Sequence, residues 1–340
     1  MKEARCVVCC GTSQVVVWRE NGYEGRACHC GTVYTSPEPP AGAVDFTHDG
    51  HPDSFYSLYA MLKARWLKGC RPRGRLLEIG CGEGYFLAAA RSLGYEVAGV
   101  EPEPGRAARV TQRLGIDVRC SLLEDLHFPV AKFDIVYHCD LLSHFPDPIE
   151  ALRKMTGLLA RDGILAFEVG ILGGIQPFWY RWIESLGYPQ HRWFYSERSL
   201  RSLLSRAGLR IERTRHFGLA PCVALYRSRV LLGKVVRSLL GPGRNGPSPG
   251  DPPATRLAGG NDKVRKELRR HMEDSFTHME QFFRYRVGAV APRIGPGTLL
   301  VAARPEPDLR PQGSDLRPPD SDLRPQGSDL RPLANWNKLT

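Results

Sequence analysis

The chain has 340 residues, 42% of them hydrophobic, so it is long and apolar enough to bury a full core and is globular at least in its middle. Its formal net charge of +11 is concentrated in residues 181–237, which contain twelve Lys and Arg but only three Glu. Such a segment either binds an anionic partner or forms a solvated Arg-rich surface. The sequence contains no run of about 18 apolar residues and no apolar signal core, which argues against a membrane span and a secretory signal, and we expect a cytoplasmic protein.

The first predicted unit, residues 1–36, is rich in cysteine. Five of the ten cysteines lie within the first 30 residues, in Cys6-x2-Cys9-Cys10-Gly11 and Cys28-His29-Cys30-Gly31. Two such knuckles, each followed by glycine, are typical of a structural zinc site with four thiolate ligands. We therefore predict a zinc-ribbon-like module whose ligands are Cys6, Cys9, Cys28 and Cys30.

The spacing of these knuckles leaves alternatives. Cys10 competes with Cys9, and the second knuckle has one residue between its cysteines where two are usual, so His29 is a possible substitute ligand. The other interpretation is a small β-hairpin whose metal ligands have been lost.

A proline-rich connector over 37–42 precedes a predicted helix that begins near Asp53. Its apolar residues follow helical spacing, at Phe55, Leu58, Tyr59, Leu62 and Trp66. This helix either packs on the following domain or places its aromatic side chains over a ligand.

Residues 75–102 predict a nucleotide-binding element. A strand over Leu76–Ile79 leads into the glycines at 80, 82 and 84, then a helix to about Leu93 and a strand over Val97–Val100 that ends on Glu101. Glycines at such a turn let backbone amides approach a ligand, and a carboxylate after the second strand can accept hydrogen bonds from both ribose hydroxyls. We therefore expect a cofactor that carries a nucleoside.

Two details favour S-adenosylmethionine (SAM) over a nicotinamide dinucleotide. The glycines have the spacing Gly-x-Gly-x-Gly rather than Gly-x-Gly-x-x-Gly. Glu78, two residues before the first glycine, would repel a pyrophosphate but suits a cationic amino-acid group.

With the motif LLEIGCGEGYFL, the sequence resembles the class I SAM-dependent methyltransferases over about residues 45–304. The resemblance implies an α/β, Rossmann-like, seven-stranded sheet with an antiparallel last strand. It also implies a set of cofactor-binding residues, namely Glu78, Gly80, Cys81, Gly82, Gly84, Glu101, Pro102, Ser121, Leu122 and Asp140. Many relatives have an aspartate at the adenine pocket, where this chain has Ser121 and Leu122.

The resemblance continues after the fourth strand, which is predicted over Phe133–Tyr137. The segment 138–148, HCDLLSHFPDP, is similar to a family signature, with Ser143 where glutamate is common. A helix over 149–159, a turn over 161–163 and a strand over 164–169 are expected to follow.

Two histidines are candidates for the general base. His144 lies after the fourth strand, where an imidazole could take a proton from an attacking hydroxyl, or could only hydrogen-bond loop backbone. His191 lies in a histidine and aromatic segment, 188–196, that resembles one branch of these methyltransferases.

The remaining chain contains a predicted helix over 196–207, strands over 209–215 and 297–303, and an insertion over 218–290. Within the insertion, we expect an amphipathic helix over 221–240 that lies on a membrane surface or forms a substrate lid, a flexible stretch over 241–260 and a second helix over 261–286. Asp-Leu-Arg recurs every seven residues in 305–340, with prolines that favour a disordered tail.

We therefore expect a small-molecule methyltransferase whose acceptor is anionic, and the cysteine module makes the chain resemble the sugar-nucleotide C-methyltransferases. The alternative is a catalytically reduced SAM-binding protein with a zinc interaction module. A nucleic-acid methyltransferase is a further alternative, but the sequence has no Asn-Pro-Pro-aromatic motif. We expect no nucleic-acid partner.

Overall fold

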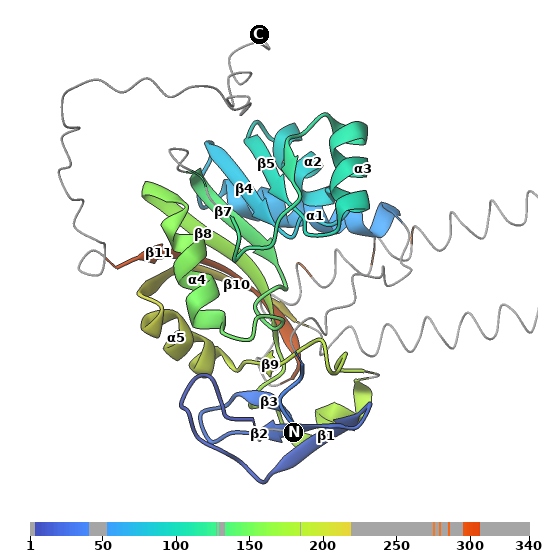
Figure 1. Cartoon of the computed structure of the whole chain (residues 1–340), viewed down its shortest axis with the longest axis vertical. Helices are drawn as coiled ribbons and strands as arrows, with labels where there is room; N and C mark the ends of the chain where they lie inside the picture. The colour runs from blue at the N-terminus through green and yellow to red at the C-terminus, as the bar shows by residue number, and fades with distance from the viewer. Residues whose placement is uncertain are drawn as a thin grey trace, which may run out of the picture.

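A computed structural model describes residues 4–40, 53–126, 128, 133–183, 185–218 and 295–306, together with the helical residues 275, 279 and 285 (Figure 1). The predictions for the lid or membrane helix over 221–240, the flexible stretch 241–260 and the tail beyond 306 lie outside the described residues. So does most of the helix predicted over 261–286.

The large sheet has seven strands in the order β10-β11-β8-β7-β4-β5-β6. Its strands in chain order are β4 (Arg75–Ile79), β5 (Glu96–Val100), β6 (Val118–Arg119), β7 (Phe133–Cys139), β8 (Leu159–Ile171), β10 (Leu209–Gly218) and β11 (Gly297–Pro305). All neighbouring pairs from β6 to β8 are parallel, whereas β11 runs antiparallel to both β8 and β10. This confirms the predicted fold class with its reversed last strand.

Five α-helices and one 3-10 helix accompany the strands in the described residues. They are α1 (Asp53–Lys68), α2 (Tyr85–Ser92), α3 (Pro104–Leu114), α4 (Pro148–Gly157), η1 (Pro177–Trp182) and α5 (Glu197–Arg206). Figure 1 shows α1, α2 and α3 grouped around β4 and β5, with α4 and α5 on the other side of the molecule.

Alternation along the strands divides the core between the two faces of the sheet. Leu76 and Ile135 pack in the cluster that contains residues of α1, α2 and α3, whereas Leu77 and Val136 pack in the cluster that contains residues of α4 and α5. Consecutive side chains of a strand point to opposite faces, so helices on both sides require the nearly continuous apolar strands that the sequence has.

A second, four-stranded sheet has the order β1-β2-β3-β9 and is antiparallel throughout. Three of its strands belong to the cysteine-rich segment, namely β1 (Val16–Glu20), β2 (Tyr23–Ala27) and β3 (Val33–Ser36). The fourth, β9 (Trp193–Phe194), comes from the chain between β8 and α5. The cysteine-rich segment therefore completes its sheet with a strand from the larger domain.

One local prediction was wrong. Residues 161–163, expected as a turn, belong to β8, where the pairing with β7 shifts between Phe133↔Leu159 and Ile135↔Ile164. The extra residues bulge out of the ladder, because β8 advances five positions while β7 advances two.

Among the described residues, none of the helices has both the length and the apolarity that crossing a bilayer requires.

Candidate functional site

The glycine loop joins β4 to α2 and has a left-handed backbone at all three glycines. The φ angles are +68° at Gly80, +54° at Gly82 and +75° at Gly84. A Cβ on Gly80 would approach Leu141 to 2.7 Å and one on Gly84 would approach Val110 to 2.7 Å, whereas one on Gly82 would meet nothing within 4 Å. The outer glycines therefore allow close packing, and Gly82 is the point where the backbone faces open space.

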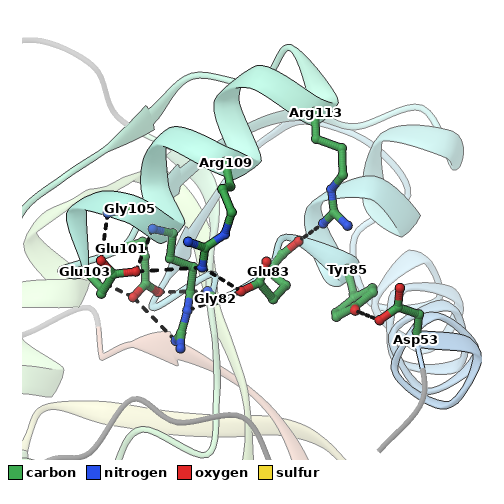
Figure 2. A network of polar contacts seen from close by, with 10 residues as sticks. Asp53, Gly82, Glu83, Tyr85, Glu101, Glu103, Gly105, Arg109 and Arg113 are labelled. Atoms are coloured by element: carbon green, nitrogen blue, oxygen red, sulfur yellow. Dashed lines mark hydrogen bonds and ion pairs between the residues drawn. The ribbon is translucent and has the colours of Figure 1, made fainter. Parts of the chain in front are cut away.

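Glu101, at the end of β5, is held against this loop. One carboxylate oxygen accepts a hydrogen bond from the Gly82 amide at 2.8 Å, and the other accepts from the Glu103 amide at 3.3 Å (Figure 2). The residue is 2% exposed, and the Arg106 guanidinium lies 3.7 Å from the second oxygen. The loop and the predicted ribose acceptor therefore form one unit. A carboxylate has further lone pairs, so it can accept additional hydrogen bonds where a ligand reaches it.

Arginines of α3 bind the outer side of the loop, and the sequence patterns did not indicate them. Arg109 lies 3.2 Å from the Glu83 carboxylate, and Arg113 donates to the Glu83 backbone carbonyl (Figure 2). At the first residue of α2, the Tyr85 hydroxyl donates to the Asp53 carboxylate at 2.5 Å. These contacts attach both α1 and α3 to the glycine loop.

Glu78, at the end of β4, is 3% exposed, and its Oε2 has no hydrogen-bond partner in the described part of the chain. Burial raises the pKa of this carboxyl well above its usual value. The positive charge of the nearby Lys63 opposes this increase, and the negative charge of Glu101 adds to it. A buried carboxyl with an unpartnered oxygen is a costly feature. A cation that entered this edge of the sheet would stabilise its charged form.

A buried ionic cluster next to Glu78 was not predicted. Lys63 of α1 lies 3.1 Å from Glu168 of β8 and donates to the Cys139 sulfur at 3.1 Å, and the Tyr59 hydroxyl donates to Glu168 at 2.5 Å. Burial alone would lower the pKa of Lys63, but Cys139 and Glu168 raise it, so the ammonium form is favoured. The sequence feature that could have predicted this cluster is the carboxylate within the otherwise apolar strand predicted over 164–169.

The two candidate histidines come together. Their ring centroids are 4.5 Å apart, although His144 follows β7 and His191 precedes β9. Nδ1 of His144 is 3.1 Å from the Gln190 carbonyl, and Nδ1 of His191 is 2.7 Å from the Leu186 carbonyl. A carbonyl can only accept, so Nδ1 carries a proton in both rings.

Burial, and to a smaller extent the adjacent His191, lowers the pKa of His144 to about 4. The ring is therefore neutral at pH 7, and its Nε2 can accept a proton. A backbone hydrogen bond from Arg192 to the Ser143 carbonyl, 2.7 Å long, joins the two loops that carry the histidines.

Other candidates near the strand ends have different environments. His138 is fully buried in β7 and stacks on Phe167 with centroids 4.9 Å apart, and burial lowers its pKa to about 3. Asp140 has φ +51° and donates its amide to the Glu168 carbonyl. Burial raises the pKa of Asp140 above its usual value.

The remaining predicted cofactor residues lie beside the glycine loop and after β6. Cys81 is buried, and the Pro102 carbonyl accepts from the Cys120 thiol at 3.6 Å. Ser121 donates its hydroxyl to the Leu122 carbonyl, and Leu122 is 52% exposed. The assignment of Ser121 and Leu122 to an adenine pocket stays a prediction.

The cysteine site contains four thiols. The sulfurs of Cys6, Cys9, Cys28 and Cys30 all lie within 4.8 Å of one another. Cys6 and Cys30 are 3.5 Å apart, and Cys9 and Cys28 are 3.3 Å apart. Tetrahedral zinc with bonds of about 2.3 Å needs sulfurs roughly 3.8 Å apart, so the set fits that ion. Cys10 is exposed and lies outside the group, so Cys9 rather than Cys10 is close to the other three sulfurs.

Comparison with known proteins relates this arrangement to one enzyme family. Residues 54–214 match the model of a family described as a methyltransferase domain. The ubiquinone biosynthesis O-methyltransferase of Actinobacillus pleuropneumoniae serotype 5b is 32% identical over 120 residues, which are 32% of this chain and 50% of that protein. The protein of the same name from Cereibacter sphaeroides is 29% identical over 152 residues, 40% of this chain and 60% of that protein.

A solved structure of an S-adenosylmethionine dependent methyltransferase from Mesorhizobium loti has 18% identity and a TM-score of 0.40. That match covers 71% of this chain and 97% of the other. The chain spans about half the length of the curated relatives it matches.

Proposed function

We propose that this chain, whose residues 54–214 carry a class I SAM-dependent methyltransferase domain, transfers a methyl group from SAM to a small-molecule acceptor. The observation that carries the proposal is the hydrogen bond from the Gly82 amide to Glu101, because it joins the open glycine turn to the acid predicted to bind ribose.

The residues at the glycine loop fit SAM. Gly82 has no atom within 4 Å of a Cβ position, Glu101 supplies a carboxylate beside it, and Glu78 keeps an unpartnered buried oxygen among the described residues. The bound cofactor supplies an electrophilic methyl group on a sulfonium, so the protein mainly has to position the acceptor and exclude water. We assign Ser121 and Leu122 to the adenine, and Pro102, Cys81 and Asp140 to the rest of the cofactor surface.

We assign acceptor activation to His144 and His191. Backbone carbonyls hold a proton on Nδ1 of each ring, so the lone pair of the neutral imidazole lies on Nε2. A neutral imidazole with a free lone pair can take the proton of an attacking hydroxyl as the oxygen bonds to the methyl carbon. The names of the matched relatives favour a hydroxyl acceptor over a nitrogen one.

The proposed anionic acceptor, a sugar nucleotide included, depends on the basic segment 181–237. Several of its arginines have structural roles. The Arg192 guanidinium donates to the Pro39 and Pro40 carbonyls, Arg206 donates to the Val7 and Val8 carbonyls, and Arg213 donates to the Gly69 carbonyl. These arginines therefore hold segments of the chain together and are not free to bind an anionic acceptor. For this reason phenolic acceptors are a second class of substrate to test.

We further propose that zinc occupies the Cys6, Cys9, Cys28 and Cys30 site in a structural role. Four thiolates leave no open coordination position, which is the mark of a structural rather than a catalytic zinc.

The test is calorimetry with SAM followed by mass-spectrometric detection of methylated products from a panel of sugar nucleotides and phenols. Binding of SAM with a methylated product supports the proposal. Binding without any product would favour a catalytically reduced SAM-binding protein, and failure to bind SAM would reject both functions.

A further inference from the structure

The cysteine module holds the segment that carries His191. In the four-stranded sheet, Val33 and Tyr34 of β3 pair with Phe194 and Trp193 of β9. Because β9 begins two residues after His191, the register of a strand in the cysteine module sets the position of the histidine segment.

Thr35 makes the most direct contact. Its hydroxyl donates to the His191 carbonyl at 2.8 Å, and its amide donates to the Arg192 carbonyl at 2.9 Å. Thr35 is 2% exposed, so these hydrogen bonds are shielded from water. A buried Thr35 hydroxyl without an acceptor would cost free energy of desolvation, so this position of the His191 segment is preferred.

The hairpin β1–β2 holds the same segment from its other end. The Glu20 carboxylate accepts from the Leu186 amide at 2.9 Å, and the Asn21 side-chain amide donates to the Tyr188 carbonyl at 2.8 Å. The Leu186 carbonyl in turn accepts from Nδ1 of His191. Backbone on both sides of His191 and the acceptor of its ring proton are therefore all positioned by residues 20–35.

The thiolate site is continuous with these contacts. Cys28 donates its amide to the Thr32 carbonyl at 2.8 Å, and the Gly31 carbonyl in the second knuckle accepts from the Ser196 amide at 3.1 Å. An ion that binds Cys28 and Cys30 would order the turn from which β3 begins.

We propose that the cysteine module is a positioning element of the histidine pair. Thr35 holds the His191 backbone, and occupancy of the thiolate site by zinc orders β3 and thereby fixes the His191 imidazole against His144. The role of His191 in methyl transfer rests on the proposed function, whereas its placement by Thr35 is independent of that function.

The experiment uses the full chain and needs no acceptor. Thr35→Val removes the hydroxyl and keeps the β-branched shape, Thr35→Ser keeps the hydroxyl, and Arg19→Ala changes an exposed side chain of β1 in the same module. For each protein, and for wild type with and without added zinc, we measure three quantities. These are the amide hydrogen exchange of residues 186–196, the rate at which diethyl pyrocarbonate modifies His191, and the affinity for SAM.

We expect Thr35→Val and zinc removal to speed the exchange of residues 190–196 by about tenfold, the effect of losing one hydrogen bond. We also expect both to change the modification rate of His191 and to leave SAM affinity unchanged. Thr35→Ser and Arg19→Ala should match zinc-loaded wild type.

Wild-type exchange and modification rates in both the Thr35→Val variant and zinc-free wild type would overturn the inference. Altered rates in a protein that binds SAM but methylates nothing would support the inference while rejecting the proposed function. Where an acceptor has been found, kcat should fall in Thr35→Val with the KM for SAM unchanged, and Thr35→Ser should restore it.

Discussion

His144 and His191 face each other with ring centroids 4.5 Å apart, and each holds its Nδ1 proton on a backbone carbonyl. Rings this close are coupled, because a positive charge on one disfavours a positive charge on the other. The pair is therefore suited to accept one proton.

Replacement of either histidine by alanine should lower kcat by about 10²- to 10⁴-fold, the usual contribution of a general base. Affinity for SAM should not change, because the ring hydrogen bonds go to the Gln190 and Leu186 carbonyls rather than to the glycine loop. Because the rings act together, the double variant should lose little more than the stronger single variant. Methylation assays with calorimetry check this, and unchanged turnover in both single variants would remove the assignment.

Stability should fall in mild acid. Burial lowers the pKa of His138 to about 3 and of His144 to about 4, so the unfolded chain binds these protons at a higher pH than the folded chain does. The free energy of unfolding should decrease as the pH falls from about 6.5 to about 4, by roughly 3 kcal/mol for His144 alone. Urea denaturation across this range measures the slope, and His138→Phe should make it shallower. An equal slope in that variant would contradict the contribution of His138.

Gly82→Ala should impair SAM binding beyond its cost in stability. A left-handed alanine costs about 1–2 kcal/mol, and its methyl group would occupy the open face of the loop. Gly115→Ala is the matched control, since Gly115 has φ +59° and also has no atom within 4 Å of a Cβ position. Both variants should unfold at a similarly lowered temperature, but only Gly82→Ala should lose SAM affinity. Equal SAM affinity in the two variants would argue against the proposed cofactor position.

Metal analysis should give about one zinc per chain, as expected for a four-thiolate structural site. Cys9→Ser should abolish binding, whereas Cys10→Ser should retain it, because Cys10 lies outside the sulfur cluster. The melting temperature should fall with loss of metal. Retention of zinc by Cys9→Ser together with its loss from Cys10→Ser would reverse the ligand assignment.

Lys63→Met should destabilise the protein by about 3–5 kcal/mol, since it leaves the buried Glu168 carboxylate without its cation. The double variant Lys63→Met/Glu168→Gln should recover most of that loss and keep an oxygen for the Tyr59 hydroxyl. Denaturant titrations of the single and double variants measure the coupling. Additive losses would mean that the ion pair contributes nothing as a pair.

Local sequence patterns predicted individual strands and the glycine turn, whereas the seven-stranded sheet with its reversed last strand was implied by the resemblance to a known family. The apolar runs that became β4, β5 and β7, the glycine turn and the acid at Glu101 are local patterns, and each depends on neighbours a few positions away. The helix predicted over 196–207 became α5 with Ser196 as its N-cap for the same reason. The residues expected as a turn at 161–163 instead formed a bulge, because pairing with β7 outweighed the local preference of Asp-Gly.

The tertiary structure decided which distant residues meet. Cys9 rather than Cys10 joined the sulfur cluster, Lys63 of α1 reached Glu168, and His144 reached His191. It also placed β9 beside β3, so that the cysteine-rich segment and the histidine loop share one sheet. These contacts depend on where loops at the ends of separate strands converge and on which side chains the packed core leaves room for, and no periodicity within the chain encodes that convergence.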